Sequence, residues 1–310
     1  MTALKPADDA ETAVDIIVPT RDRPEDLKRL LPTVLAQSHD NFQLVIVDQS
    51  RDPSSNTAVI AAAADPRVLH LIQPVTGKTK GLNLALRRTA APVVAFTDDD
   101  CTLPADWLAR ALSCLALNPT AGVVFGNLVP IPHDATRVFI PAIEISRRRL
   151  LRGPSWRSHG LIGMGANMII RRAVFERVGM FDEDLGPGGV LLTGEECEIT
   201  YRALRHRVDV LREPGLTVTH WGTRPVAGGV AQALVVSGFF AVGAGYGKHV
   251  RARDLRALAV VGHETAEVLT LIVQATLLNR RPRHARRLGL FWKGIVAGLR
   301  RGPNAPALRA

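Results

Sequence analysis

Cysteine is scarce in this chain: among 310 residues there are three, Cys101, Cys114 and Cys197. No two of them have the C-x-x-C spacing, and an odd number cannot pair off completely, so a zinc ribbon or a disulfide framework is disfavoured. A chain of this length buries a core large enough to fold without such cross-links. We therefore expect a folded protein of a reducing compartment, about two ordinary domains in size.

Several catalytic and targeting patterns are also missing. The sequence has neither a G-x-x-x-x-G-K-[ST] phosphate loop nor a G-x-S-x-G nucleophile elbow. The G-x-G-x-G run at 243–247 does not follow the first strand of a βαβ unit, and the H-E-x-x-E run at 263–267 lacks the second histidine of a zinc protease. No secretory signal pattern opens the sequence, and we expect residues 1–13 to form a flexible tail.

Excess positive charge is confined to the C-terminal fifth. The net charge is +10, and residues 248–310 alone hold 13 Lys or Arg against three Asp or Glu. The densest block comprises Arg280, Arg281, Arg283, Arg286 and Arg287. Aromatic residues are too few here for base stacking, whereas arginines mixed with apolar residues are typical of a helix on a membrane surface. We expect an anionic membrane as the partner, ahead of a merely solvated tail, and no nucleic acid.

The first 220 residues alternate short β-rich runs with helical patterns. Strands are predicted at 15–19, 43–47, 68–72, 93–97 and 122–125. One helical face between the first two comprises Leu27, Leu30, Leu31, Val34 and Leu35, and Pro32 within it predicts a kink or an early end. Further helices are predicted near 54–64, 79–90, 104–117 and 195–206. The alternation indicates a mainly parallel sheet, which binds ligands at the carboxyl ends of its strands.

The C-terminal third is predicted to be helical. The uncharged run 225–247 is long enough to cross a bilayer, but it contains six glycines and few large apolar residues. The segment 255–279 carries charged residues, among them Arg256, Glu264 and Glu267. We interpret both as buried or interfacial helices, and a membrane span at 225–247 is the less favoured alternative.

Three adjacent carboxylates, Asp98, Asp99 and Asp100, follow the predicted strand at 93–97. They repel one another, and a divalent cation would neutralise them. Carboxylate oxygens together with substrate phosphates are ligands that Mg²⁺ and Mn²⁺ prefer. The triplet therefore predicts a metal–diphosphate site, and a solvated turn is the weaker alternative.

Two other strand ends carry polar residues. Pro19, Thr20 and Arg21 come just before a predicted helix, whose N-terminal amides favour an anion. Asp48 follows the second strand, where a carboxylate could accept a hydrogen bond from a base or a ribose. A capped turn is the alternative at both places.

The run Thr193–Glu198 places three acids at the start of a predicted helix. A carboxylate at a helix N-terminus is favoured in its charged form, which suits a general base. Thr193 and Glu196 also fit a capping box, which needs no active site. The local pattern leaves these alternatives equal. His220, alone after a predicted strand, is by itself more typical of a structural histidine.

In order along the chain, these segments resemble the family 2 glycosyltransferases, which are inverting enzymes of the GT-A fold. The resemblance covers about residues 14–222 and lies in the linked series IIVPTRDRPEDLKRLLPTVLAQ, LVIVDQS, GLNLAL, VVAFTDDDCTLPADWL, GMGANMIIRRAVFERVGMFDEDLGPGG, GEECEITYRAL and VTHWG. It implies an α/β fold with a mixed, mainly parallel sheet sandwiched by helices. The expected organisation is a catalytic domain at 14–224 and a helical, basic, amphipathic, membrane-associating region at 225–310.

The resemblance also implies roles for single residues. The expected donor-nucleotide contacts are Pro19, Thr20, Arg21, Asp48, Asp98 and Asp99. The expected metal ligands are Asp100, Asp98 and His220, with Mn²⁺ or Mg²⁺ as the cofactor. Gly165, Ala166 and Asn167 resemble a loop that closes on donor and acceptor. Glu196 occupies the position of the catalytic base, where the family commonly has Asp, and Glu195 is the alternative.

The implied reaction is a single displacement. A sugar would pass from a nucleotide-diphosphate donor to the hydroxyl of a glycan or lipid-linked acceptor of the cell envelope, with inversion. The resemblance implies a cytoplasmic enzyme, peripheral on the inner face of the cell membrane. The alternatives are a nucleotidyltransferase of similar fold and an inactive module that binds nucleotide sugars or lipids.

Overall fold

A computed structural model of the chain describes residues 12–153, 162–277 and 283–308. Most of the predicted tail at 1–13 therefore lies outside the described residues. Within them, a nine-stranded sheet runs in the order β3-β2-β1-β4-β9-β6-β10-β5, with β8 beside β10. The strands are β1 (Val14–Thr20), β2 (Phe42–Asp48), β3 (Val68–Ile72), β4 (Val93–Phe96), β5 (Cys101–Thr102), β6 (Ala121–Pro130), β8 (Arg149–Leu151), β9 (Met168–Arg171) and β10 (Asp209–His220).

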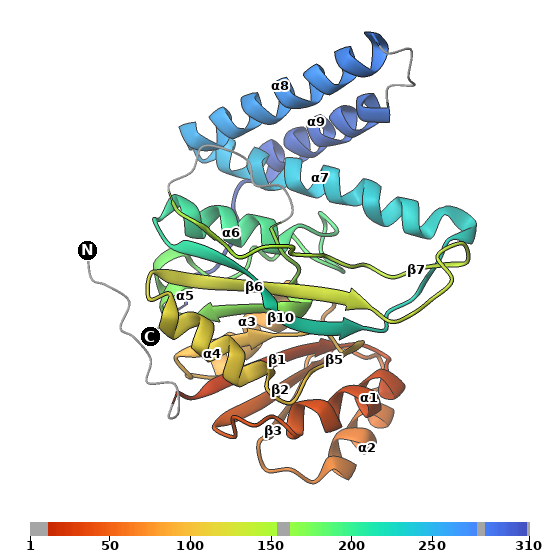
Figure 1. The fold of residues 1–310 in the computed structure, drawn as a ribbon, viewed down its shortest axis with the longest axis vertical. Helices are drawn as coiled ribbons and strands as arrows, with labels where there is room; N and C mark the ends of the chain where they lie inside the picture. Colours follow the sequence, from red (N-terminus) through yellow and green to blue (C-terminus); the bar gives the residue numbers. More distant parts are fainter. Residues whose placement is uncertain (1–11, 154–161, 278–282, 309–310) are drawn as a thin grey trace.

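Six of these strands point the same way. β1, β2, β3 and β4 pair in parallel, as do β6 and β10, and β9 lies antiparallel between β4 and β6. The short strands β5 and β8 pair antiparallel with β10. The expected mixed, mainly parallel sheet is thus confirmed, and its parallel strands end at one edge (Figure 1).

Helices cover both faces of the sheet (Figure 1). One buried core joins the sheet to α1 (Pro24–Leu35), α2 (Ser54–Ala63) and α4 (Trp107–Leu117). A second core on the other face joins it to α3 (Lys78–Arg88), α5 (Arg172–Val178) and α6 (Glu195–Arg205). The predicted helices agree with these bounds within three residues. Pro32 lies inside α1, which continues to Leu35, so the helix does not end early at this proline.

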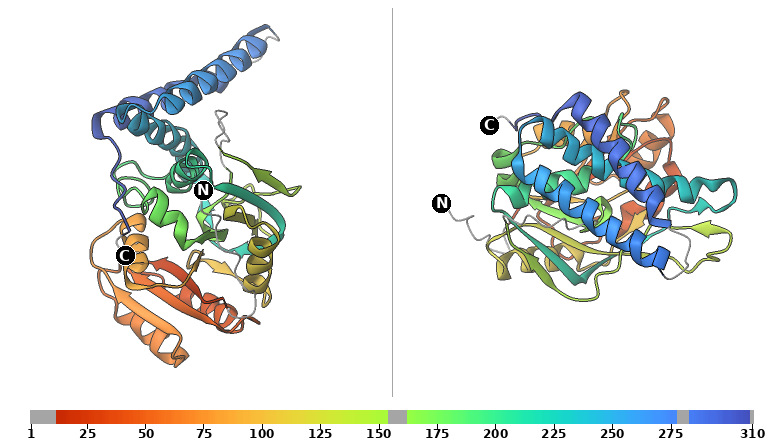
Figure 2. Two further views of the ribbon diagram at one scale, coloured as in Figure 1. Left: turned by 90° about the vertical axis from the view of Figure 1, so that its left-hand side faces the viewer. Right: turned by 90° about the horizontal axis from the view of Figure 1, so that it is seen from above.

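Three long helices form a further layer over α6, as Figures 1 and 2 show. They are α7 (Val230–Arg251), α8 (Leu255–Leu277) and α9 (Arg283–Arg301). The contact of α7 with α9 is backbone to backbone: a Cβ on Gly247 or Gly294 would collide with a carbonyl of the other helix. Away from the crossing, α8 and the start of α9 extend beyond the body of the protein (Figure 2).

The junction at 224 and 225, expected as a domain boundary, lies inside β11 (Arg224–Pro225), which pairs antiparallel with β7 (Val138–Phe139). Among the described residues, one stretch is long and apolar enough to cross a membrane by length and composition alone, and it is Leu255–Gln274 of α8. Only 17% of it is buried. This apolar stretch therefore lies on α8 and not on the run 225–247.

Candidate active site

The acidic triplet lies at the carboxyl edge of the sheet, beside the end of β1. β1 and β4 are parallel neighbours, so Thr20 and the residues after β4 lie side by side. The Thr20 hydroxyl donates a hydrogen bond of 2.8 Å to Asp99 Oδ2. Two of the segments predicted to bind the donor are therefore in direct contact.

Arg23 bridges the second and third acids of the triplet. Its Nη1 lies 2.8 Å from Asp99 Oδ1 and 3.0 Å from Asp100 Oδ2. Burial opposes the charged guanidinium, but Asp99 and Asp100 outweigh it and raise the pKa of Arg23. Arg21, which the sequence favoured as a nucleotide contact, is exposed and lies 3.6 Å from Asp22. Arg23, which the sequence analysis did not single out, is therefore the arginine of this turn that contacts the triplet, and the nucleotide contact expected of Arg21 stays a prediction.

The acids of the triplet differ in their environments. Burial, opposed by Arg23 and reinforced by Asp100, raises the pKa of Asp99 to about 6. Burial would also raise the pKa of Asp100, but a hydrogen bond and the charge of His220, together with Arg23, lower it to about 2. Asp100 therefore keeps its negative charge throughout the neutral range.

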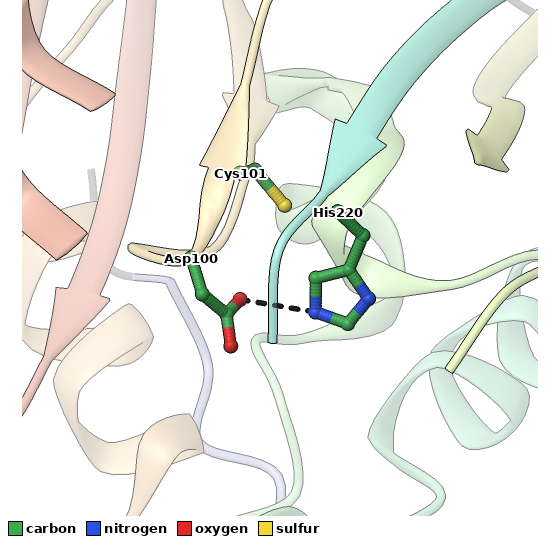
Figure 3. A group of neighbouring side chains, drawn as sticks. All are labelled: Asp100, Cys101 and His220. Carbon is green, nitrogen blue, oxygen red and sulfur yellow. Dashed lines mark hydrogen bonds and ion pairs between the residues drawn. The ribbon is translucent and has the colours of Figure 1, made fainter. Parts of the chain in front are cut away.

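Asp100 and His220 lie together as a candidate metal site, drawn in Figure 3. His220 Nε2 is 3.1 Å from Asp100 Oδ1, and its Nδ1 donates to the Pro141 carbonyl at 2.7 Å. Such a second bond orients an imidazole for metal binding. The Cys101 sulfur is close by, but burial and the charges of Asp98 and Asp100 raise the pKa of this thiol.

The donor set fits a hard cation. A protonated thiol is a poor ligand, which leaves a carboxylate oxygen, a donor that Mn²⁺ and Mg²⁺ prefer, and an imidazole nitrogen, a softer donor that Mg²⁺ accepts less readily. Asp98, which was also expected as a ligand, instead pairs with Lys78: Asp98 Oδ1 lies 2.9 Å from Lys78 Nζ. Asp100 thus lies with His220, whereas Asp98 forms an ion pair with Lys78.

Lys78 joins the triplet to the acids of α6. Besides Asp98, its Nζ approaches Glu195 Oε1 at 3.7 Å. Burial opposes the ammonium charge, but Asp98, Glu195 and Glu196 outweigh it and raise the pKa of Lys78. Sequence reasoning missed this residue, because its partners are remote in sequence. A pocket between these groups is lined by Pro19, Lys78, Leu82, Phe96, Thr97, Asp98, Gly165, Met168, Glu195 and Glu196.

The two glutamates at the start of α6 have different surroundings. Burial and the neighbouring Glu196 raise the pKa of Glu195 to about 8, although Lys78 opposes the shift. Glu195 is 3% exposed, and its Oε2 has no hydrogen-bond partner among the described residues. Glu196 is half-buried, and its Oε1 accepts a 2.9 Å hydrogen bond from the Gly165 amide. Glu195 therefore holds its proton to a higher pH than an exposed glutamate does.

The capping box between Thr193 and Glu196 is not formed. The N-cap of α6 is Gly194, with φ at +96°, and no side chain caps the helix. The Glu196 carboxylate reaches across to Gly165 instead of back to its own helix. The structural alternative for Glu196 is therefore wrong, and its carboxylate lines the pocket.

The segment Gly165–Asn167 forms a short 3₁₀ turn before β9. Gly165 borders the pocket, and Ala166 is buried in the core. Asn167 faces away: its Oδ1 accepts from Trp107 Nε1 at 3.0 Å and its Nδ2 donates to the Asn127 and Leu216 carbonyls. Asn167 thus anchors this turn, and of the three residues only Gly165 lines the pocket.

Asp48 lies at the end of β2, directly opposite Thr20 in the register. It is fully buried, its Oδ1 accepts from the Ser50 amide at 2.9 Å, and its Oδ2 has no hydrogen-bond partner among the described residues. The adjacent Gln49 donates to the Val75 and Gly77 carbonyls and fixes the loop that leads into α3. The ends of β1, β2 and β4 thus form one continuous polar edge.

Solved structures with similar folds identify the fold of this chain. The mannosyltransferase PcManGT from Pyrobaculum calidifontis, solved with GDP-Man and Mn²⁺, superposes with a TM-score of 0.56 at 19% identity, covering 92% of this chain and 86% of that one. TarS 1–349 of S. aureus in complex with UDP-GlcNAc gives a TM-score of 0.61 at 14% identity, covering 92% and 82%. The chain therefore has the GT-A fold.

The family follows from the sequence match. The model of "Glycosyl transferase family 2" matches residues 15–179, more than half of the chain, and the chain belongs to this family. It is 25% identical over 249 residues to the O-antigen biosynthesis protein RfbC of Myxococcus xanthus, covering 69% of this chain. It is 29% identical over 189 residues to the glucosyl-dolichyl phosphate glucuronosyltransferase of Haloferax volcanii, covering 57%. The matches span 19% and 58% of these relatives' own lengths.

Proposed function

We propose that this chain is an inverting glycosyltransferase that moves a sugar from a nucleoside-diphosphate sugar to an acceptor hydroxyl. The observation that carries the proposal is the pocket that Lys78 spans, with Asp98, the first acid of the triplet, on one side and the Glu195–Glu196 pair on the other. One side of this pocket suits a charged diphosphate, and the other suits removal of a proton from an acceptor. A single displacement requires both on opposite sides of the reacting carbon.

The donor side binds and orients the nucleotide. The proposed contacts are Pro19, Thr20, Asp48, Asp98 and Asp99, and Arg23 and Lys78 supply positive charge beside them. Asp100 and His220 are the proposed metal ligands, because their donor atoms suit Mn²⁺ or Mg²⁺. A cation bound there supplies Lewis-acid stabilisation of the leaving diphosphate.

Glu196 is the proposed general base. Its Oε1 is oriented by the Gly165 amide, its carboxylate lines the pocket, and the raised pKa of the neighbouring Glu195 makes that residue the less suitable base. Glu196 takes the proton of the acceptor hydroxyl while the oxygen attacks the anomeric carbon. The bond from that carbon to the phosphate oxygen breaks on the opposite face, the nucleoside diphosphate leaves, and the configuration inverts. A positioned base contributes about 10²–10⁴ in rate.

A lipid-linked or cell-envelope glycan is the proposed acceptor, at the inner face of the cell membrane. The names of the two curated relatives, which refer to O-antigen and to a dolichyl phosphate, support this choice. The C-terminal helices supply a matching surface. Exposed apolar side chains include Leu269, Leu271, Val273 and Leu277 on α8 and Trp292 and Val296 on α9, and the basic residues Arg286, Arg287 and Lys293 of α9 are also exposed.

Membrane binding has a direct test. We expect the protein to co-sediment with anionic liposomes at low salt, because each basic residue near an anionic surface contributes about 1 kcal/mol. The double variant Leu269→Ser/Leu271→Ser should reduce the bound fraction, and neutral liposomes should bind less. Equal binding to neutral and anionic vesicles, or no binding at all, would refute the membrane proposal.

The transfer reaction is tested by nucleotide binding and product analysis. Thermal unfolding with UDP, GDP, dTDP or CDP, each with and without Mn²⁺, identifies the nucleotide, because a ligand at 100 times its Kd adds about 2.7 kcal/mol. Incubation with the matching nucleotide sugar should then release the nucleoside diphosphate. Release of pyrophosphate would indicate a nucleotidyltransferase, and binding without release would indicate an inactive module.

A further inference from the structure

Lys248 is a fully buried cation on α7, far in sequence from every residue of the pocket. Its Nζ lies 2.6 Å from Asp182 Oδ1 and 2.8 Å from Asp184 Oδ2. A buried ammonium is costly unless such partners compensate its lost hydration. The backbone of Asn304, beyond α9, also donates to Asp182 Oδ2 at 2.8 Å. Two parts of the C-terminal region thus converge on the segment just before α6.

That segment leads directly to the pocket. Thr79 Oγ1 donates to the Leu185 carbonyl at 2.8 Å, and the Lys78 amide donates to the Pro187 carbonyl at 2.8 Å. Gly186, with φ at +90°, packs so closely that an added Cβ would lie 3.1 Å from Thr79 and 3.4 Å from Glu195 Oε2. The backbone of 185–187 therefore sets where Lys78 and Glu195 lie.

We infer that Lys248 is a positioning residue for the transfer reaction: it holds Asp182 and Asp184, and through the segment 182–187 it fixes Lys78 and Glu195 in the pocket. This role rests on the proposed glycosyltransferase activity. Without the ammonium, the two neighbouring carboxylates lose their one buried cation and keep only the bonds from Asn304 and the more distant Arg301, and the segment that carries them moves away. The C-terminal helices then belong to the catalytic apparatus and are more than a membrane attachment.

The position of Lys248 is itself fixed by packing. A Cβ on Gly298 of α9 would lie 2.7 Å from the Lys248 amide nitrogen, so the two helix backbones touch at this level. His249, the next residue, lies 2.8 Å from Glu198 Oε1 through its Nε2 and so contacts the first turn of α6. α7 therefore contacts both the catalytic helix and the segment that precedes it.

The test compares Lys248→Met with Arg251→Met, in the full-length chain. Arg251 lies three residues further along the same helix and carries the same charge, but it is exposed and donates its hydrogen bond to the Leu299 carbonyl of α9, away from the segment 182–187. Hydrogen–deuterium exchange reports the position of the segment without any need for activity. We expect exchange of peptides spanning 181–187 and 195–205 to accelerate at least about tenfold in Lys248→Met, with β1 and β2 unchanged.

Kinetics supply the second readout. In Lys248→Met, kcat for nucleoside diphosphate release should fall at least about tenfold, because small displacements of reacting groups lower the rate of the chemical step. The KM for the nucleotide-sugar donor should change little. Asp184→Asn keeps the Lys248–Asp182 pair, and it should fold and show a smaller fall in kcat. It carries the test if Lys248→Met does not fold.

The outcomes separate this inference from the proposed function. A wild-type chain that releases no nucleoside diphosphate refutes the function, whereas exchange still decides whether Lys248 holds the segment. Unchanged exchange at 181–187 overturns the inference. So does a Lys248→Met protein that melts earlier but keeps the wild-type kcat below its melting point, or an Arg251→Met protein with the same loss.

Discussion

Exchanging Glu196 and Glu195 for glutamine, one at a time, tests which carboxylate removes the proton. Glutamine keeps the size of the side chain and removes its charge and basicity. At pH 7 and with acceptor present, Glu196→Gln should lower the rate of nucleoside diphosphate release by a factor of about 10²–10⁴. Glu195→Gln should cost less than about tenfold, because the pKa of Glu195 is about 8 and the wild-type side chain is already neutral.

The same shift gives an independent pH signature. The folded-state pKa of Glu195 is raised from its ordinary value of 4.5, so the folded protein holds a proton that the unfolded chain releases. The free energy of unfolding therefore falls as pH rises from about 4.5 to about 8, by at most about 1.4 kcal/mol per pH unit from this group. In Glu195→Gln that contribution is absent, so stability should fall less over this range.

The assays are steady-state release of nucleoside diphosphate and urea unfolding between pH 4.5 and 8.5. Nucleotide binding, measured by thermal shift, is the control, and both variants should retain it. Loss of at least about 10² in Glu195→Gln with little loss in Glu196→Gln would refute the assignment and make Glu195 the base. An unchanged pH slope of stability would contradict the proton on Glu195.

Three further perturbations probe other parts of the site. Gly165→Ala places a Cβ 2.9 Å from Glu196 Oε1, so kcat should fall at least about tenfold, whereas Gly238→Ala, in open space, should be neutral in the same assay. Asp100→Asn and His220→Gln should each abolish the Mn²⁺-dependent part of the nucleotide thermal shift, and a full shift would exclude that residue as a ligand. Burial opposes the charge of Glu198, but Arg202 and His249 lower its pKa to about 2. The free energy of unfolding should therefore decrease as pH falls from about 4.5 toward 2, by about 3 kcal/mol at most. Unfolding followed by circular dichroism against pH checks this, and Glu198→Gln should remove that contribution.

The fold could be predicted from sequence wherever hydrophobic periodicity is strong. The pattern at 68–72 matches β3 in full, and the helix predicted at 195–206 differs from α6 by one residue. β9, with four residues, gave no signal of its own, and its antiparallel place between β4 and β6 depends on pairing with strands more than 40 residues away. The apolar character of α8 was likewise underestimated, because Arg256, Glu264 and Glu267 interrupt a stretch that is apolar on average.

Within the site, the segments were predictable but the individual contacts were not. Position after a strand identified Thr20, Asp48 and the acidic triplet, since strand ends meet at one edge. Which of Arg21 and Arg23 faces the acids depends on the geometry of the turn before α1, which the sequence does not reveal. Lys78 was missed for the same reason: its partners, Asp98 and Glu195, are brought to it only by the folded sheet.

The crossing of α7 and α9 has a consequence for how the protein unfolds. The two helices touch through glycine backbones, and Lys248 and Asp254 form ion pairs with residues of the GT-A body. The helices therefore cannot separate from that body without exposing buried charge. The body and these helices should therefore melt as one cooperative unit, with a single calorimetric transition. The outer half of α8, whose side chains are largely exposed, should open first, well below that transition.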